Sequence, residues 1–393
     1  MKSARGENGI GKRVFLGLKD CFVKRKRLKS GNNYLRLKEK NKVLLAEDIR
    51  EKRHVLRAYP PFIGLGTDSR CNLRCIMCVQ RLEDRKTLMD APTIEEKYFI
   101  KFAEEVFPTA ETLQLNTAGE PLMSRNFDLE LEMAAKFQVQ LDVITNGLLL
   151  NSKKGQLQQL CNNAKAIQFS FDSPVLDTYE SIRVGSDFKK VVENMRLLQK
   201  YRAELPAVNR PFFGINMVVM KRNLSELQEM VRFAKDIGVD HLGFASIHIH
   251  SEAMEEESLV PVKQEVNRSL LAAKALADSL GVKITIPPLD SFLPEVAVGQ
   301  VGNSIPSRTP EVEPEINRCP FLWNRTYLDN EANVFVCCEP SHPVAGSIQD
   351  QDFKAIWNGE IYEKMRRTFT GGPPDKYCER CARVGYLSKI NPF

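Results

Sequence analysis

The 393-residue sequence contains no long hydrophobic run, and this absence excludes several classes of protein. Its longest apolar stretches are strand-length pieces such as residues 143–150, which are too short to cross a bilayer. The charged N-terminus is not followed by the apolar segment of a secretory signal peptide. With 43% hydrophobic and 27% charged residues, the composition is typical of a soluble globular protein rather than a disordered one. We therefore expect a cytoplasmic protein.

The first 58 residues lack the alternation of polar and apolar residues that β-strands require. They are strongly basic, with 18 Lys or Arg against 6 Asp or Glu. Phe15, Leu18 and Phe22 fall on one face of a helix among these basic side chains. Such a helix suits peripheral contact with an anionic membrane surface or an acidic partner. The alternative is an arm that packs a few apolar residues on its own domain.

The ten cysteines do not indicate a disulfide scaffold, which is typical of small secreted chains. Cys21 and Cys161 stand apart, whereas the other eight form two tight groups. The groups are Cys71, Cys75 and Cys78, and Cys319, Cys337, Cys338, Cys378 and Cys381. Clustered cysteines in a reduced compartment favour metal binding.

From residue 61 onward, short β-rich runs alternate with helical patterns. The expected strands are residues 61–68, 111–117, 139–146, 164–172, 212–220 and 240–246. Strand–helix repetition of this kind is typical of a parallel sheet, so the predicted fold class is α/β. Six such units predict a partial (β/α)6 TIM-type barrel, in which the reacting groups lie at the C-terminal ends of the strands.

These patterns divide the chain into four expected regions. They are a basic, mainly helical N-terminal extension (1–58), a core barrel (59–250), a connecting segment (251–318) and a small C-terminal domain (319–393). The C-terminal domain contains a hairpin-like stretch at 326–336 and the second cysteine group.

The first cysteine group has the spacing C-x3-C-x2-C and follows directly on the first expected strand, at the reacting edge of a barrel. A structural zinc site takes four ligands, usually from two short motifs. Iron–sulfur clusters are bound by thiolates, and a set of three leaves one iron open to a further ligand. The spacing therefore favours an iron–sulfur cluster with an open coordination position.

The stretch CNLRCIMC (71–78), together with AGEP (118–121) at the end of the second strand, resembles the radical S-adenosylmethionine (SAM) superfamily. The resemblance covers residues 61–247 and implies a radical SAM core. It implies that the three cysteines of the loop hold three irons of a [4Fe–4S] cluster, while the amino and carboxylate groups of SAM bind the fourth. One electron then cleaves SAM to a 5′-deoxyadenosyl radical, which abstracts hydrogen from a substrate.

The same resemblance implies a set of SAM-binding positions at the strand ends. Backbone groups of Gly119 and Glu120 would meet the amino group of SAM, and Pro121 would fix their turn. Arg183 would approach the carboxylate, for which a guanidinium fork is suited. The remaining positions are Met77 near adenine, Thr145, Asn146, Ser170 and Asp172 at the strand ends, and Asn216 and Val218 on the fifth strand. For the six residues at the strand ends and on the fifth strand, a purely structural role is the alternative.

The second cysteine group resembles the SPASM or twitch extension of radical SAM oxidoreductases and peptide maturases, with a hairpin that ends in cysteines, an IWN helix and a closing CxxC. The resemblance implies an auxiliary [4Fe–4S] cluster that accepts an electron. Its ligands would be Cys319, Cys337, Cys378 and Cys381, with Cys338 as the alternative to Cys337. No cysteine follows Cys381, so we expect one such cluster. Structural zinc is the alternative occupant.

Together these motifs predict a radical SAM oxidoreductase that acts on a small carbohydrate-like molecule or a peptide. The lack of strands before residue 59, and so of the winged-helix leader-binding domain of many peptide maturases, favours the small molecule. Flavodoxin or ferredoxin is the expected electron donor. A radical SAM enzyme that modifies RNA is one alternative, but nucleic acid is not expected because no aromatic interleaving or RNA-binding module accompanies the basic head. A non-catalytic zinc-binding scaffold is the other.

Overall fold

The computed structural model describes residues 31–82, 84–115, 118–151, 156–249, 251–287, 319–337 and 343–371. The predicted amphipathic helix around Phe15 and the cysteines Cys338, Cys378 and Cys381 lie outside these residues. Among the described residues, no helix combines the length and the hydropathy that a membrane-crossing segment requires.

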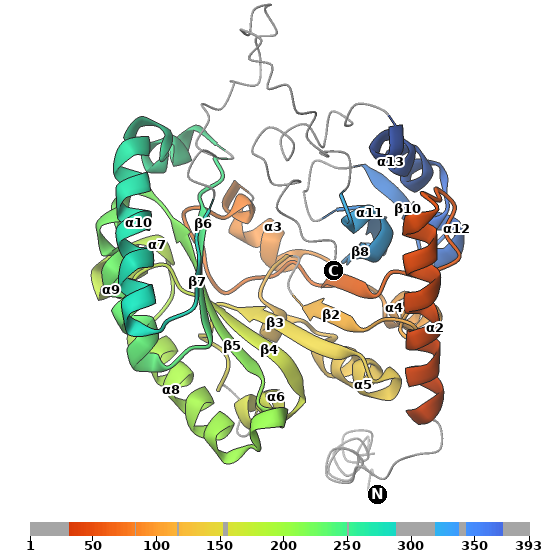
Figure 1. The fold of residues 1–393 in the computed structure, drawn as a ribbon, viewed down its shortest axis with the longest axis horizontal. Helices are drawn as coiled ribbons and strands as arrows, with labels where there is room; N and C mark the ends of the chain where they lie inside the picture. The colour runs from red at the N-terminus through yellow and green to blue at the C-terminus, as the bar shows by residue number, and fades with distance from the viewer. Residues whose placement is uncertain are drawn as a thin grey trace, which may run out of the picture.

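Within the described residues, ten strands form one sheet in the order β10-β9-β8-β1-β2-β3-β4-β5-β6-β7 (Figure 1). Neighbouring strands from β1 to β7 pair in parallel. These seven strands are β1 (Phe62–Gly66), β2 (Thr112–Leu115), β3 (Gln140–Thr145), β4 (Ala164–Ser170), β5 (Phe212–Val219), β6 (His241–Ser246) and β7 (Ile284–Thr285). The prediction of an α/β fold with a partial barrel is confirmed: all six expected strands are present, and the sheet is not closed.

Helices cover the outer side of this sheet (Figure 1). They are α4 (Glu96–Val106), α5 (Phe127–Phe137), α6 (Gln156–Asn163), α7 (Leu176–Ile182), α8 (Phe188–Glu204), α9 (Leu227–Ile237) and α10 (Lys263–Leu280). Shorter helical turns are α3 (Arg85–Asp90), η1 (Val79–Leu82), η2 (Pro121–Met123), η3 (Ala207–Asn209), η4 (Lys221–Glu226), η5 (Glu252–Glu257) and η6 (Val260–Val262).

Helix α9 shows why these segments fold and pack as they do. Its buried residues recur at intervals of three and four, which places them on one face of a helix; they are Leu227, Met230, Val231, Ala234 and Ile237. The helix ends at Gly238, whose φ of 75° lies in the left-handed region that glycine adopts without a side-chain clash.

The two faces of the sheet differ in character along β2 to β5. Side chains on the helix-covered face are apolar and buried; they include Leu113, Leu141, Val143, Ile167, Phe169, Phe213 and Ile215. On the other face, Gln114, Asp142, Gln168 and Asn216 are only partly buried. Hydrogen bonds of 3.4, 2.8 and 3.0 Å join these four side chains in that order, from strand to strand. We call the four residues the polar belt.

The C-terminal elements extend the same sheet beyond β1. Strand β8 (Arg325–Asp329) pairs in parallel with β1, and it forms a hairpin with β9 (Asn333–Phe335), which in turn pairs with β10 (Val344–Ser347). The predicted hairpin is thereby confirmed. Helices α11 (Phe321–Asn324), α12 (Phe353–Trp357) and α13 (Glu360–Gly371) pack around it. The C-terminal region is therefore continuous with the core sheet, and its treatment as a separate domain stays a prediction.

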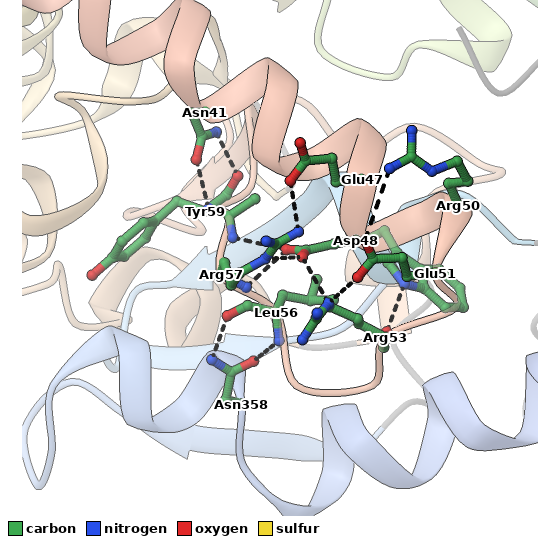
Figure 2. Close-up of polar contacts among 12 residues, drawn as sticks. Asn41, Glu47, Asp48, Arg50, Glu51, Arg53, Leu56, Arg57, Tyr59 and Asn358 are labelled. Atoms are coloured by element: carbon green, nitrogen blue, oxygen red, sulfur yellow. Dashed lines mark hydrogen bonds and ion pairs between the residues drawn. The ribbon is translucent and has the colours of Figure 1, made fainter.

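Helix α2 (Gly31–Arg50) and the segment after it are fastened by buried polar groups (Figure 2). The fully buried carboxylate of Asp48 accepts hydrogen bonds from the Arg57 side chain at 2.8 Å and from the backbone N–H of Ala58 at 3.0 Å. The Asn41 amide pairs with both backbone groups of Tyr59 at 2.8 Å. These contacts fix the chain just before it enters β1.

The IWN motif of the C-terminal region docks on this same segment (Figure 2). The Asn358 side chain bonds the backbone N–H and C=O of Leu56 at 2.7 and 2.9 Å, and the indole of Trp357 donates to the Ala58 carbonyl at 2.9 Å. Arg366, also buried, donates to the carbonyl of His54 at 2.9 Å. Residues about 300 positions apart are thus held together beside the start of β1.

Candidate active site

The cysteine loop (residues 71–78) begins five residues after β1 ends, at the C-terminal edge of the parallel strands. Its three thiols are free and partly accessible. Two flanking segments hold this loop: the turn that follows β2 on one side and the end of α7 on the other.

On the β2 flank, the chain leading to the loop and the Gly119–Glu120 turn are in backbone contact. The N–H of Glu120 donates to the carbonyl of Arg70 at 2.9 Å, and the Arg70 guanidinium bridges the buried Asp68 carboxylate and the carbonyl of Met123, both at 2.7 Å. Gly119 has a φ of 72°, and a Cβ there would lie 2.6 Å from the Arg70 carbonyl oxygen. Only glycine fits this approach, which explains the glycine of the predicted AGEP motif.

The Glu120 side chain ties the same turn to the end of β3. Its carboxylate accepts hydrogen bonds from the hydroxyl of Thr145 at 2.6 Å and the backbone N–H of Asn146 at 2.8 Å. Burial raises the pKa of Glu120 to about 7, although these donors and that of Leu122 oppose the rise. Pro121 is buried at the start of η2, as its fixed φ allows. The side chains of Thr145 and Glu120 thus bond each other, and the SAM contacts predicted for Gly119, Glu120 and Thr145 stay predictions.

A third contact of this flank involves a residue that the sequence did not single out. The Asn146 amide donates to the side-chain oxygen of Asn72 at 2.9 Å, so the end of β3 touches the cysteine loop itself. Within the described part of the chain, the buried Nδ2 of Asn72 has no hydrogen-bond partner. A buried amide donor beside Cys71 is suited to an oxygen acceptor on a ligand. Asn72 could have been singled out from the sequence because it lies inside the cysteine motif, directly after Cys71.

Behind the β2 flank lies a second buried carboxyl, that of Glu130 on α5. It accepts hydrogen bonds from the hydroxyl of Thr67, just after β1, and from that of Ser124, just after η2. Burial raises the pKa of Glu130 to about 7. This side chain therefore joins the two segments that meet at Gly119.

On the α7 flank, two backbone hydrogen bonds pair the loop with the chain that follows α7. The N–H groups of Arg74 and Ile76 donate to the carbonyls of Val184 and Ile182, each at 2.9 Å. This register places residue 183 opposite residue 75. Arg183 Nη1 lies 3.8 Å from the Cys75 sulfur, within range of an N–H···S hydrogen bond.

Arg183 is held from its other side by Asp172. Its Nε lies 2.7 Å from Asp172 Oδ2. The two atoms form an ion pair, but their geometry does not meet the criteria of a hydrogen bond. Both side chains are almost completely buried. Burial would lower the pKa of Arg183, but the charges of Asp172 and Cys75 outweigh it, so the pKa lies above its ordinary range. Asp172 Oδ1 also accepts the backbone N–H of Val218 at 2.8 Å, which links β4 to β5.

The other predicted SAM-binding residues are spread along the same edge. Met77 packs partly buried against the core, and Ser170 is the last residue of β4, paired in register with Asn216. The Asn216 amide bonds Gln168 within the polar belt. A further buried amide, Asn223, bonds the carbonyls of Asp172 and Val218 at 2.8 and 2.9 Å, a brace that nothing in the sequence signalled. The structure thus brings the predicted residues to one edge, while their contacts to SAM stay predictions.

Burial disfavours the ionised form of two thiols of the loop, those of Cys71 and Cys75. Burial raises the pKa of Cys71 to about 12 and that of Cys75 to about 11, and neighbouring thiols contribute to both shifts. Metal ligation requires thiolates, which bound iron stabilises. Across the described ranges, no three Cys, His, Asp or Glu side chains form a closed ligand set. Three thiols, a glycine cradle and an unpaired amide donor fit a SAM-binding cluster.

The second cysteine group is only partly described. Cys319 precedes α11 and Cys337 follows β9, and both are partly buried against the core. The buried Tyr362 hydroxyl, which donates to the carbonyl of Phe335 at 3.0 Å, lies near Cys337. The choice between Cys337 and its neighbour, and the auxiliary ligand set as a whole, stay predictions.

Comparison with protein families identifies the class. Residues 68–234 match the model of the radical SAM superfamily, and residues 319–382 match that of the SPASM iron–sulfur cluster-binding domain. The chain thus contains a radical SAM domain and a C-terminal SPASM domain, and this combination matches a radical SAM enzyme. Its cofactors are a [4Fe–4S] cluster with SAM in the core and auxiliary iron–sulfur binding in the SPASM domain. The resemblance drawn from the two cysteine groups is confirmed.

Relatives of known activity differ in what they make. The tungsten-containing aldehyde ferredoxin oxidoreductase cofactor-modifying protein of Pyrococcus furiosus is 32% identical over 185 residues, which are 46% of this chain and 49% of that protein, so the match spans about half of its length. The AdoMet-dependent heme synthase of Methanosarcina barkeri is 23% identical over 310 residues, which are 78% of this chain and 85% of that protein. The PqqA peptide cyclase of Granulibacter bethesdensis is 21% identical over 323 residues, which are 79% of this chain and 77% of that protein.

Solved structures agree on the fold. SuiB of Streptococcus suis bound to S-adenosylmethionine superposes with a TM-score of 0.61 at 13% identity, covering 89% of this chain and 79% of its own. Native anSMEcpe with bound AdoMet gives a TM-score of 0.59 at 17% identity, with coverage of 84% and 91%. At such identities the likeness establishes the architecture of core and extension.

Proposed function

We propose that this enzyme cleaves SAM reductively at a [4Fe–4S] cluster bound by Cys71, Cys75 and Cys78, and oxidises its substrate by hydrogen abstraction. The observation that carries the proposal is the cysteine loop at the C-terminal edge of the sheet, clamped on the β2 flank and on the α7 flank. When bound, the reduced cluster supplies the electron that breaks SAM into methionine and a 5′-deoxyadenosyl radical, and the auxiliary cluster takes up the electron that the substrate radical releases.

The protein's own groups position and shield this chemistry. The carboxylate of Glu120 and the ion pair of Asp172 with Arg183 keep the strand ends at fixed distances from the loop. The Asn72 amide offers a hydrogen-bond donor beside the first thiol. Preorganised donors of this kind hold a polar cofactor in one orientation without further ordering cost.

The substrate is proposed to be a polar peptide or a carbohydrate-like small molecule. The polar belt supports this, because its four side chains present amide and carboxylate groups on the face of the sheet that the helices leave uncovered. Peptide substrates are supported by the names of two relatives, the PqqA peptide cyclase and the subtilosin biosynthesis protein AlbA of Bacillus subtilis. Flavodoxin or ferredoxin is the proposed electron donor.

Anaerobic turnover tests the core of this proposal. Protein reconstituted with iron and sulfide is incubated with SAM and dithionite, and 5′-deoxyadenosine is quantified. Replacing Cys71, Cys75 and Cys78 by Ala should abolish its formation. Cys161→Ala is the matched control, because this thiol is buried in α6 away from the loop. Continued formation in the triple variant would refute the assignment of the loop.

Metal analysis tests the cofactor content separately. About eight irons per chain correspond to two [4Fe–4S] clusters and about four to one. Stoichiometric zinc without iron would contradict the proposed chemistry.

A further inference from the structure

We infer that Arg183 is a positioning residue that sets the reduction potential of the cluster on the cysteine loop, by directing a buried positive charge and an N–H donor at the sulfur of Cys75. The inference rests on the proposed function and deepens it. It differs from the role given to Arg183 by the family resemblance, which was to approach the carboxylate of SAM.

The backbone fixes the contact. The hydrogen bonds from Arg74 and Ile76 to the two carbonyls flanking residue 183 leave Arg183 directly across from Cys75. Its Nη1 lies 3.8 Å from the sulfur, whereas its Nε is occupied by Asp172 at 2.7 Å. The guanidinium therefore spans from Asp172 to the thiol, and neither end is free to turn away.

The charge at this position is felt strongly because water is excluded. Arg183 is 6% exposed and Asp172 is fully buried. Charges interact several-fold more strongly in such surroundings than in water. The Arg183 Nη1 lies 3.8 Å from the Cys75 sulfur, whereas Asp172 contacts the guanidinium at Nε, so the positive charge is the nearer of the two to the sulfur. Cys75 therefore experiences a net positive field from the pair.

That field favours reduction. A cluster gains one negative charge when it takes up one electron, and a nearby cation stabilises the state with more negative charge. Hydrogen bonds to cluster sulfurs act in the same direction. Arg183 should make the one-electron reduction that precedes SAM cleavage easier, so its loss should lower the potential.

A purely structural role predicts something else. If Arg183 only held the loop in place, its loss would reduce the amount of bound cluster but leave the potential of the remaining clusters unchanged. The two roles are therefore separated by a measurement of potential, with no need for turnover.

The test compares Arg183→Gln with Arg196→Gln in reconstituted full-length protein. Arg196 is a fitting control, because it lies on α8 with a 66% exposed side chain and a loose ion pair of 3.7 Å to Asp236. The readout is an EPR-monitored redox titration, with the loop cluster recognised by the change of its signal when SAM is added. Arg183→Gln should shift the midpoint potential of this cluster to more negative values, and Arg196→Gln should leave it unchanged.

Iron loss to a chelator gives a second readout. Groups that hydrogen-bond to a metal ligand typically change metal affinity by about 10–100-fold, so Arg183→Gln should release iron from the loop cluster at least about tenfold faster than the control. Should Arg183→Gln fail to fold, the double variant Arg183→Met with Asp172→Leu decides, because removing both buried charges leaves neither unpaired. It too should lower the midpoint potential.

An unchanged potential in a folded, cluster-bearing variant overturns the inference while leaving the proposed function intact. Absence of any cluster on the loop of the unmodified protein would instead overturn the proposed function.

Discussion

On its β2 flank the cysteine loop is held by the carboxyls of Glu120 and Glu130, which accept hydrogen bonds from uncharged donors, and by the ion pair of Asp68 with Arg70, whose side chain is 13% exposed. On its α7 flank it meets the ion pair of Asp172 with Arg183, in which neither side chain is more than 7% exposed. The β2 flank relies on the glycine at 119 and on the carboxyls of Glu120 and Glu130, which contact hydroxyl and backbone N–H donors. The α7 flank relies on Arg183 between Asp172 and Cys75.

This difference predicts which substitutions or conditions destabilise each flank. Glu120 and Glu130 accept their hydrogen bonds from uncharged donors, so the β2 flank should be sensitive to pH. The close backbone approach at Gly119 should make it sensitive to added atoms as well. A buried ion pair is costly to break, because the partner left behind stays charged in a water-poor site. The α7 flank should therefore respond most to a change of charge.

The largest expected effect is on the α7 flank. Asp172→Asn leaves the Arg183 guanidinium buried without its counter-charge, and this should lower the free energy of unfolding by about 3–5 kcal/mol. Glu120→Gln removes a buried carboxyl whose hydrogen bonds come from uncharged donors, and should cost about 1–3 kcal/mol. Urea denaturation of both variants measures the two losses under identical conditions. Equal losses would show that the flanks do not differ in the way proposed.

The next effect compares the two glycines that approach the loop. A Cβ at Gly119 would lie 2.6–2.8 Å from three backbone atoms of residues 68–70, whereas one at Gly185 would lie 3.6 Å from the Asn72 carbonyl oxygen. Both residues have positive φ, 72° and 93°. Gly185→Ala should therefore cost about 1–2 kcal/mol from backbone conformation alone.

Gly119→Ala adds the steric clash to the same conformational cost, so its total should reach about 3 kcal/mol. Because the displaced backbone carries the Arg70 carbonyl that leads into Cys71, iron content after reconstitution should also fall in Gly119→Ala more than in Gly185→Ala. A Gly119→Ala variant with the stability and iron content of Gly185→Ala would argue that the β2 turn has room to move.

Sequence and structure agree most closely where a motif is local. The six strands follow from runs of β-rich residues between amphipathic helices, and the loop of Cys71, Cys75 and Cys78 falls where the first strand was expected to end. The turn at Gly119 could be recognised because glycine and proline mark special backbone conformations within a few residues.

Long-range partners were much harder to predict. The SAM contacts of Asp172 and Arg183 stay predictions, and the ion pair between the two residues was not foreseen, because it depends on α7 returning the chain to the strand end that it had just left. Asn223 and Glu130 carry no pattern that separates them from other polar residues, and their roles depend on segments brought together only by the fold. The continuity of β8 with β1 was likewise invisible, since pairing across more than 260 residues has no local signal.

The smallest expected effect is the pH dependence of the β2 flank. Burial raises the pKa of Glu130 to about 7, so the folded protein favours its protonated form relative to the unfolded chain. The stability from this shift is fully present below the unfolded pKa, near 4.5, and is lost as the pH rises through about 7. Between pH 6 and pH 8 the loss should be about 1 kcal/mol.

Glu130→Gln keeps the shape and cannot titrate, so its stability should fall less over this range than that of the unmodified protein. The Glu120 carboxyl, whose pKa is also raised to about 7, should leave a residual slope in the variant. Urea denaturation of the unmodified protein and of Glu130→Gln at both pH values measures the difference. If the free energy of unfolding falls equally with pH in both proteins, Glu130 is already ionised in the folded state, with its charge stabilised by the hydroxyls of Thr67 and Ser124.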